Sequence, residues 1–311
     1  MKALLAAALV GIVHVHHAPS HDTDAPFADV VQAAEEVGLD FVVLTEHSDR
    51  SDDGPLPGAS RAGLHRSDQG HGLLVLLGAE FGTADGHLIG LDIPRVYASQ
   101  DAAGEMLAGR ELIGRIHADG GFAVVPHPFT HGGWADWDAP FDGLEVQNNA
   151  SDYRRQYGLL YPFRLLRFAV DPSGGLASML KRPTRELERW ESLREGGRSV
   201  VAFAGADAHQ NTSILGWQLD PYARMFSQVQ MLCPDGPLEP AYVWSVLRSG
   251  RCSIRWRVHE HHADRAREVR FPSGRTELGL DDGRRVLEVR NLPPGAPPEA
   301  LPRSPDARRS P

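Results

Sequence analysis

Five short apolar runs in this chain each end in histidine or acidic side chains, and this pattern constrains the fold more than any other feature. Continuous apolar runs of this length are typical of strands in a buried parallel sheet. Examples are LDFVVLTEH, LLVLLGAEF and SVVAFAGADAH. The side chains at the run ends are, in chain order, His14, His16, His47, Glu80, His127, Asp207 and His209.

Helical patterns alternate with these runs. Apolar residues recur at helical spacing over 27–37, where we expect Asp24 as the N-cap and Gly38 as the end. Further helices are predicted from about 104 to 118 and over 241–248. The alternation of strand and helix indicates an α/β fold with a largely parallel sheet. In such folds, sites form at the carboxyl ends of the strands, so the run ends are expected to lie together.

The stretch IVHVHHAPSHD is the start of a predicted metal site. His14 and His16 flank one valine, and alternate residues of a strand point to the same face. Ser20 and Asp22 follow in a loop that can fold back over the strand end. Paired imidazole nitrogens followed by a carboxylate are the ligand types that zinc, manganese and iron use. The alternative for this stretch alone is a histidine-rich loop without function.

Length and charge limit the remaining possibilities. With 311 residues, the chain is long enough for one large domain with an appendage. We expect a main domain over 1–253, a small β-rich appendage over 254–292 and a disordered tail rich in proline and arginine over 293–311. The formal net charge is -9, so a nucleic-acid duplex is not an expected partner. The oligomeric state is left open.

The N-terminus has two interpretations. MKALLAAALVGIV resembles a signal peptide, but it leads directly into His14, so cleavage at the usual distance would disrupt the histidine pair. We therefore expect a buried first strand and a cytoplasmic protein, with a secreted or periplasmic location as the alternative. A membrane association is not expected, since no other stretch is apolar enough to span a bilayer. The pairing of the two cysteines, Cys233 and Cys252, cannot be deduced from their spacing.

An ordered series of short motifs gives the chain a family resemblance. The series runs His-x-His, Ser-x-Asp, Thr-Glu-His, Gly-x-Glu, Gly-His-Leu, Pro-His-Pro and Gly-x-Asp-x-His, over roughly 11–253. In this order the motifs resemble the PHP (polymerase and histidinol phosphatase) superfamily. SHD, GLDFVVLTEH and GHLIGL are also similar to its branch of carbamate-ester hydrolases, the CehA/McbA-like group. The resemblance implies a distorted seven-stranded (β/α) barrel.

The resemblance also implies two or three divalent metal ions, zinc, manganese or iron. One ion would be held by His14, His16, Glu80 and Asp207, and Glu80 would bridge to a second ion. The second ion would also be bound by His87 and His127, and a third by Asp22, His47 and His209. Metals held close together lower the pKa of a water between them, and the resulting hydroxide is the implied nucleophile. Among the ligands, Glu80, Asp207 and His209 are the expected catalytic residues.

The function implied first is a metal-dependent hydrolase acting on a small-molecule phosphoester. A carbamate, ester or amide hydrolase is the alternative, because no motif fixes an arginine clamp for phosphate; the candidates are Arg50, Arg61, Arg154 and Arg155. A non-catalytic metal-binding module is a third possibility. A polymerase-associated exonuclease is ranked last, since the chain lacks room for a polymerase.

Several polar residues near the motifs have weaker assignments. Glu46 is expected to orient a ligand rather than bind metal. His17 faces either the cavity or only the loop, and Glu145 and Asn148 either touch substrate or serve structure. No catalytic role is expected for a further set of histidines: His21, His65, His71, His117 and His131. The cluster at His259, His261 and His262 is interpreted as a solvated or edge-strand group rather than a metal site.

Overall fold

Strand β1 (Ala8–Val15) lies at the centre of the sheet and pairs with three other strands. It runs parallel to β2 (Phe41–Leu44) and β9 (Val201–Ala208), and its first half pairs antiparallel with β12 (Val229–Pro234). The predicted buried first strand is therefore confirmed for the part of the apolar run that is described. Residues 1–7, which bear on the signal-peptide alternative, lie outside the described residues.

The computed structural model describes nine stretches of the chain. They are 8–66, 72–130, 133–154, 180, 182–214, 216–259, 266–270, 275–280 and 285–291. The predicted tail over 293–311 and the histidines His71, His131, His261 and His262 fall outside them.

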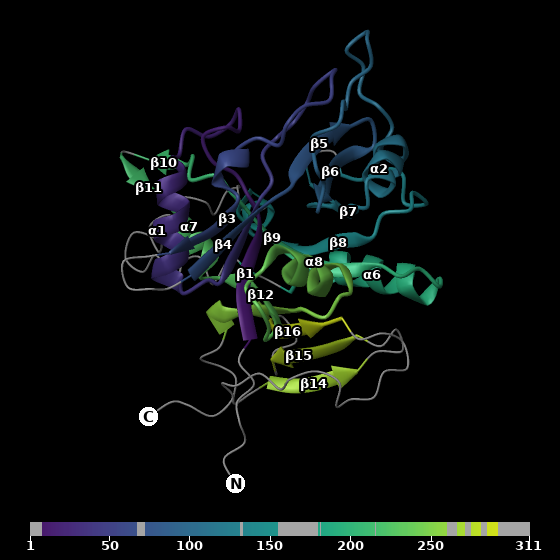
Figure 1. Ribbon diagram of the computed structural model, residues 1–311. Coiled ribbons are helices and arrows are strands. Elements are labelled where there is room, and N and C mark those ends of the chain that lie inside the picture. The colour runs from purple at the N-terminus through teal and green to yellow at the C-terminus, as the bar shows by residue number, and fades with distance from the viewer. Residues whose placement is uncertain are drawn as a thin grey trace.

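One large mixed sheet contains most of the strands (Figure 1). The further strands are β3 (Gly63–Arg66), β4 (Gly72–Leu77), β5 (Ala79–Thr83), β6 (Gly86–Leu91), β7 (Phe122–Val125), β8 (Gly143–Asn148), β13 (Ser253–Trp256), β14 (Ala266–Arg270), β15 (Thr276–Leu280) and β16 (Val286–Arg290), with β10 (Ser213–Ile214) and β11 (Trp217–Gln218) in a separate hairpin. Each strand runs parallel to the next along the order β4, β2, β1, β9, β8, β7. Strand β6 runs antiparallel to both of its neighbours, β7 and β5. The α/β class with a largely parallel centre is confirmed.

Backbone bonds join the segment after β2 to β5. The Ser48 N–H donates to the Glu80 carbonyl at 2.8 Å, and the Glu80 N–H donates to the Glu46 carbonyl at 3.0 Å. His47 and Glu80 thereby form an isolated parallel bridge. Strand β5 is the last strand at one end of the sheet order. This link places it beside the segment that follows β2, the neighbour of β1. The specific seven-stranded barrel stays a prediction.

Helices cover the sheet in two groups. The helices are α1 (Phe27–Val37), α2 (Gly109–Ala118), α3 (Asn149–Arg154), α6 (Thr184–Glu195), α7 (Tyr222–Phe226), α8 (Pro240–Arg248) and the short 3-10 helix η1 (Ala59–Arg61). Buried side chains of α2, α6 and α8 belong to one apolar cluster, and those of α1 and α7 to a second. Within the described residues, no helix combines the length and apolar character that crossing a membrane requires.

Three local expectations differ from the structure. Pro26, not Asp24, occupies the N-cap of α1, and no side chain caps that helix. The helix expected from about 104 begins at Gly109, because Ala108 is extended and the Leu107 N–H donates to the carbonyl of Ser99 instead. The stretch over 48–72 is polar and rich in Gly, Pro and Asp, which predicts a loop, whereas the structure contains η1 and β3 there. Gly38 ends α1 in the left-handed conformation, as predicted.

The C-terminal strands continue the main sheet. Strand β13 pairs with β12 on one side and β16 on the other, and β15 and β14 follow at the edge. Cys233 of β12 and Cys252, next to β13, form a disulfide and are both buried. The Asn291 side chain accepts a hydrogen bond from the Ala202 N–H at 2.8 Å and donates to the Ala202 carbonyl at 3.0 Å. The division of the chain at 253 stays a prediction.

Candidate metal centre

A cavity of about 220 Å³ opens at the carboxyl ends of the parallel strands. Its lining consists of His21, Asp22, His47, Asp49, Glu80, His87, His127, Asp207 and His209. The strand-end residues that the sequence singled out therefore meet in one place, although they lie far apart along the chain. Among the described residues that line it there is no lysine or arginine.

His14 and His16 enter the cluster from the end of β1, below the cavity lining. Both are fully buried, and their ring centroids lie 5.1 Å apart. The strand does not follow simple alternation here, because its pairing with β9 shifts register between Val13 and Val15 and His14 has a positive φ of 64°. The two imidazoles thus converge through an irregular strand end rather than through a regular pleat.

Glu80 lies between two sets of histidines. Its Oε2 is 3.0 Å from His14 Nε2 and 3.2 Å from His16 Nε2. Its Oε1 is 2.7 Å from His87 Nδ1 and 3.0 Å from His127 Nε2. Oε2 also lies 3.6 Å from His47 Nδ1. Each carboxylate oxygen therefore faces its own set of imidazoles, which is the arrangement expected of a carboxylate that bridges two cations.

Asp207 and Asp22 supply the other carboxylates. Asp207 Oδ1 lies 3.6 Å from His14 Nε2 and 3.8 Å from His16 Nε2. Asp22 Oδ2 lies 2.7 Å from His209 Nε2 and 3.4 Å from His47 Nε2. All nine predicted ligands therefore belong to one connected cluster of imidazoles and carboxylates.

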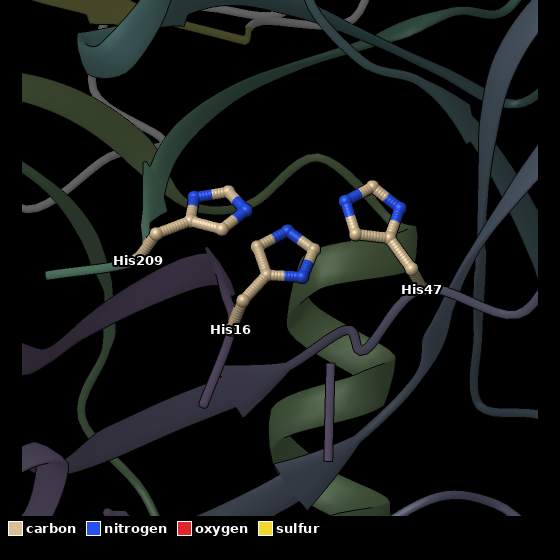
Figure 2. Close-up of side chains that lie close together, drawn as sticks. All are labelled: His16, His47 and His209. Carbon is tan, nitrogen blue, oxygen red and sulfur yellow. The ribbon is translucent and has the colours of Figure 1, made fainter. Parts of the chain in front are cut away.

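Three groups within this cluster have ligand atoms close enough to share one ion. They are His14, Glu80 and His127; His14, His16 and Asp207; and His16, His47 and His209, each with ligand atoms within 4.8 Å of one another. Figure 2 shows the last group, in which the three imidazoles approach from three different segments. The His16 ring stacks on His209 at 4.2 Å and on His47 at 4.6 Å between centroids.

Hydrogen bonds fix the ring orientation of two of these histidines. Ser20 Oγ lies 3.2 Å from His16 Nδ1 and accepts the His47 N–H at 3.1 Å. His209 Nδ1 donates to the carbonyl of Asp207 at 2.9 Å. Because the Asp207 carbonyl can only accept, Nδ1 of His209 carries the hydrogen and its Nε2 keeps the lone pair that metal-binding imidazoles require. His16 Nε2 is buried and makes no hydrogen bond within the described part of the chain.

Burial and neighbouring charges together shift the pKa values of Glu80, His14 and His16, each in its own direction. Burial opposes ionisation of Glu80, yet the neighbouring histidines hold its pKa well below the usual range. Burial likewise opposes protonation of His14, but Glu145, Glu80 and Asp207 raise its pKa. Burial lowers the pKa of His16 to about 4, so this imidazole is neutral at neutral pH. The donor set, dense in imidazole and carboxylate around the buried His16 Nε2, fits divalent metal ions.

The remaining predicted residues divide between the cavity and its surroundings. His21 lines the cavity although no role was expected for it, and Asp49 lines it although the sequence argument passed it over. Asp49 follows a ligand-bearing strand end by two residues, and this position was the available signal. Glu46 is bonded to the buried His17, rather than to a predicted ligand, and neither lines the cavity.

Other candidates lie outside the cavity lining. His65 bonds to the Arg61 carbonyl and His117 to Asp142, and these contacts are exposed. Arg50 pairs with Asp52 at 3.1 Å on the surface. His259 is buried beyond β13, away from the cavity. Glu145 and Asn148 are buried and bonded to each other, and neither lines the cavity. The side chains of Arg154 and Arg155 fall outside the described residues.

Comparison with known proteins yields weak likenesses only. No family model matches the chain. An uncharacterized protein of Methanocaldococcus jannaschii is 28% identical over 130 residues, which cover 39% of this chain and 64% of that protein. The chain thus spans less than two thirds of that relative's length.

Among solved structures, PsfC from Pseudomonas syringae is 15% identical with a TM-score of 0.45, covering 78% of this chain and 89% of PsfC. A Bacteroides vulgatus two-domain protein, described as containing a predicted PHP-like metal-dependent phosphoesterase, is 14% identical with a TM-score of 0.45, covering 90% of this chain and 78% of its own. A Bifidobacterium adolescentis protein described as a candidate metal-dependent phosphoesterase is 15% identical with a TM-score of 0.37, covering 68% and 92%. Likenesses at this level assign neither a family nor a function to the chain.

Proposed function

We propose that this protein is a metal-dependent hydrolase of the PHP type that cleaves a small phosphoester. The observation that carries the proposal is Glu80, whose two oxygens face two separate sets of histidines beside an open cavity. The ordered motif series supports the family. The bridge between His47 and Glu80 supports a barrel, because it links the two sides of the sheet that a barrel would join.

The chain's own residues have distinct roles in this proposal. Bound divalent ions would supply Lewis acidity and make water nucleophilic near neutral pH. Glu80 would hold two ions together, and its lowered pKa keeps it ionised for this purpose. Asp207 has a pKa below the usual range, so its role is to bind cations rather than to accept a proton. His209 Nδ1 already donates to the Asp207 carbonyl, which leaves Nε2 as its ligand atom.

Hydrolysis of an uncharged ester or carbamate is the second candidate. Proteins that bind phosphate commonly use arginine or lysine side chains as clamps. The described cavity lining has neither, and it includes the additional carboxylate of Asp49. A phosphate group would therefore depend on the metal ions for charge neutralisation, whereas an uncharged ester has no such need.

The test combines metal analysis with a substrate panel. Purified protein is expected to contain two or more divalent ions per chain by elemental analysis. Chelation is expected to abolish hydrolysis of p-nitrophenyl phosphates, and added zinc or manganese to restore it. Hydrolysis of p-nitrophenyl or naphthyl esters and carbamates alone would replace the first candidate with the second. Undiminished turnover after complete metal removal would contradict both. Asp207→Asn is the inactivating variant and Glu288→Gln, a buried glutamate on β16, the matched control.

A further inference from the structure

Glu145 is a buried carboxylate of β8 that the proposed chemistry leaves without a role. It is only 1% exposed, and it lies on the far side of His14 from Glu80. One of its oxygens, Oε1, accepts a hydrogen bond from His14 Nδ1 at 2.7 Å. The other, Oε2, accepts one from the backbone N–H of His127 at 3.0 Å and one from Asn148 Nδ2 at 2.9 Å. A single side chain thus ties together the ends of β1, β7 and β8.

The backbone next to the Glu145 carboxylate has two unusual features, positive φ angles at His14 and His127 and a glycine at position 205. His14 has a φ of 64° and His127 a φ of 27°, and residues with side chains seldom adopt positive φ unless their surroundings hold them there. Glu145 contacts both of these residues. On β9, a Cβ placed on Gly205 would lie 1.8 Å from Glu145 Oε1. Glycine at this position is therefore required by the carboxylate, rather than by a turn.

The contact with His14 determines which ring nitrogen is available. A carboxylate accepts hydrogen bonds, so His14 Nδ1 carries the hydrogen in this contact. In the neutral imidazole, the form that binds a metal ion, His14 Nε2 then has the lone pair, and it points at the cluster, 3.0 Å from Glu80 Oε2 and 3.6 Å from Asp207 Oδ1. A carboxylate behind a metal-binding imidazole sets its tautomer and increases its basicity.

We propose that Glu145 is a positioning residue, which fixes the tautomer of His14 and the backbone of His127 so that both present their Nε2 atoms to the metal ions. This inference rests on the proposed metal centre. It assigns Glu145 to neither substrate binding nor catalysis, since it does not line the cavity. Gly205 contributes to the same positioning, because it provides the space for the carboxylate.

Glu145→Gln tests the inference with almost no change in shape. Glutamine has one oxygen, and the Oε2 position must accept from both the His127 N–H and Asn148. If the amide oxygen occupies that position, its NH₂ group faces His14 Nδ1, which must then become the acceptor. The hydrogen moves to His14 Nε2, where it blocks metal binding. The expected result is a loss of metal affinity of about 10- to 100-fold.

Two measurements separate this role from a merely structural one. Zinc titration by calorimetry gives the affinity. ¹⁵N NMR of the histidine side chains in the metal-free protein gives the His14 tautomer, provided the pH is high enough for His14 to have lost its second proton, because its pKa is raised. We expect the hydrogen on Nδ1 in the natural protein and on Nε2 in Glu145→Gln. Unchanged zinc affinity together with an unchanged His14 tautomer in the variant would overturn the proposal.

Further variants keep the test decisive. Gly205→Ala displaces the carboxylate without changing its chemistry, and it is expected to weaken zinc binding as Glu145→Gln does. If Glu145→Gln fails to fold, as circular dichroism would show, Gly205→Ala with normal zinc affinity overturns the proposal. Glu288→Gln, an equally buried glutamate distant from the cavity, is expected to bind zinc normally. Absence of zinc binding in the natural protein would instead contradict the metal centre itself.

Discussion

The imidazole rings of His16 and His209 stack with their centroids 4.2 Å apart and their planes 16° from parallel. One ring follows the first strand of the sheet and the other follows β9, its direct neighbour. Burial lowers the pKa of His16 to about 4, and the charge on a protonated His209 acts in the same direction. The stack is therefore stable with a neutral His16, the form that binds metal.

Replacement of Glu80 by glutamine is expected to remove at least one metal ion per chain. An amide oxygen carries no full charge to offset two cations, and only one of its two polar atoms can ligate. We expect turnover to fall by roughly 1000-fold, equivalent to about 4 kcal/mol of lost transition-state stabilisation. Elemental analysis and steady-state kinetics provide the measurement. Glu111→Gln, an exposed change on α2, is the control and should retain both metal and activity.

The stability of the metal-free protein is expected to depend on pH through His47. Burial opposes its protonation, but the hydrogen bond to Asp22 and the charges of Glu80 and Asp22 raise its pKa to about 9. A raised pKa stabilises the folded state fully below the unfolded value of about 6.5. That contribution is lost as pH rises through about 9. Urea denaturation of the metal-stripped protein should therefore give a free energy of unfolding that falls across this window.

His47→Gln is the check on that assignment, since it should reduce the pH dependence over the same window. A smaller slope is expected to remain, because the pKa values of His14, His87 and His209 are also raised. Added zinc should also remove the dependence, because the ion takes the place of the proton, and its affinity should rise with pH. An undiminished slope in His47→Gln would assign the effect to another group.

Reduction of the Cys233–Cys252 disulfide is expected to lower the free energy of unfolding. The two cysteines are separated by 19 residues, and closing a loop of this size restricts the unfolded chain by about 3 kcal/mol. Guanidinium denaturation with and without reductant measures the difference. Zinc affinity should not change, because Cys233 pairs beside Leu9, at the end of β1 remote from His14. Equal midpoints in the two conditions would argue against the disulfide.

Asn291→Ala tests whether the C-terminal strands unfold with the rest of the sheet. The substitution leaves the buried N–H and carbonyl of Ala202 without their partner. We expect a loss of about 2–6 kcal/mol, since each of the two unsatisfied buried groups costs about 1–3 kcal/mol. Unfolding followed by circular dichroism and by tryptophan fluorescence should stay a single transition with a lower midpoint. Two separate transitions would instead support an independent appendage over 254–292.

The sequence by itself determined the α/β class and the pool of candidate ligands. Apolar runs that end in His47, Glu80, His127 and Asp207 are a local pattern, and parallel strands place their carboxyl ends at one edge. Helix ends were harder to predict from the sequence. The start of α2 depends on the hydrogen bond from the Leu107 N–H to the Ser99 carbonyl, which a local periodicity does not indicate.

Only the tertiary structure decided how these residues are connected. The two oxygens of Glu80 face different sets of histidines because β5 is bonded to the segment after β2. Glu145 reaches His14 because β8 and β1 both flank β9, where Gly205 leaves the space. Such contacts depend on strand order and on distances between residues remote in sequence. The spacing of residues along the chain indicates the period of each strand and helix. It indicates neither the order of the strands in the sheet nor the distances between residues remote in sequence.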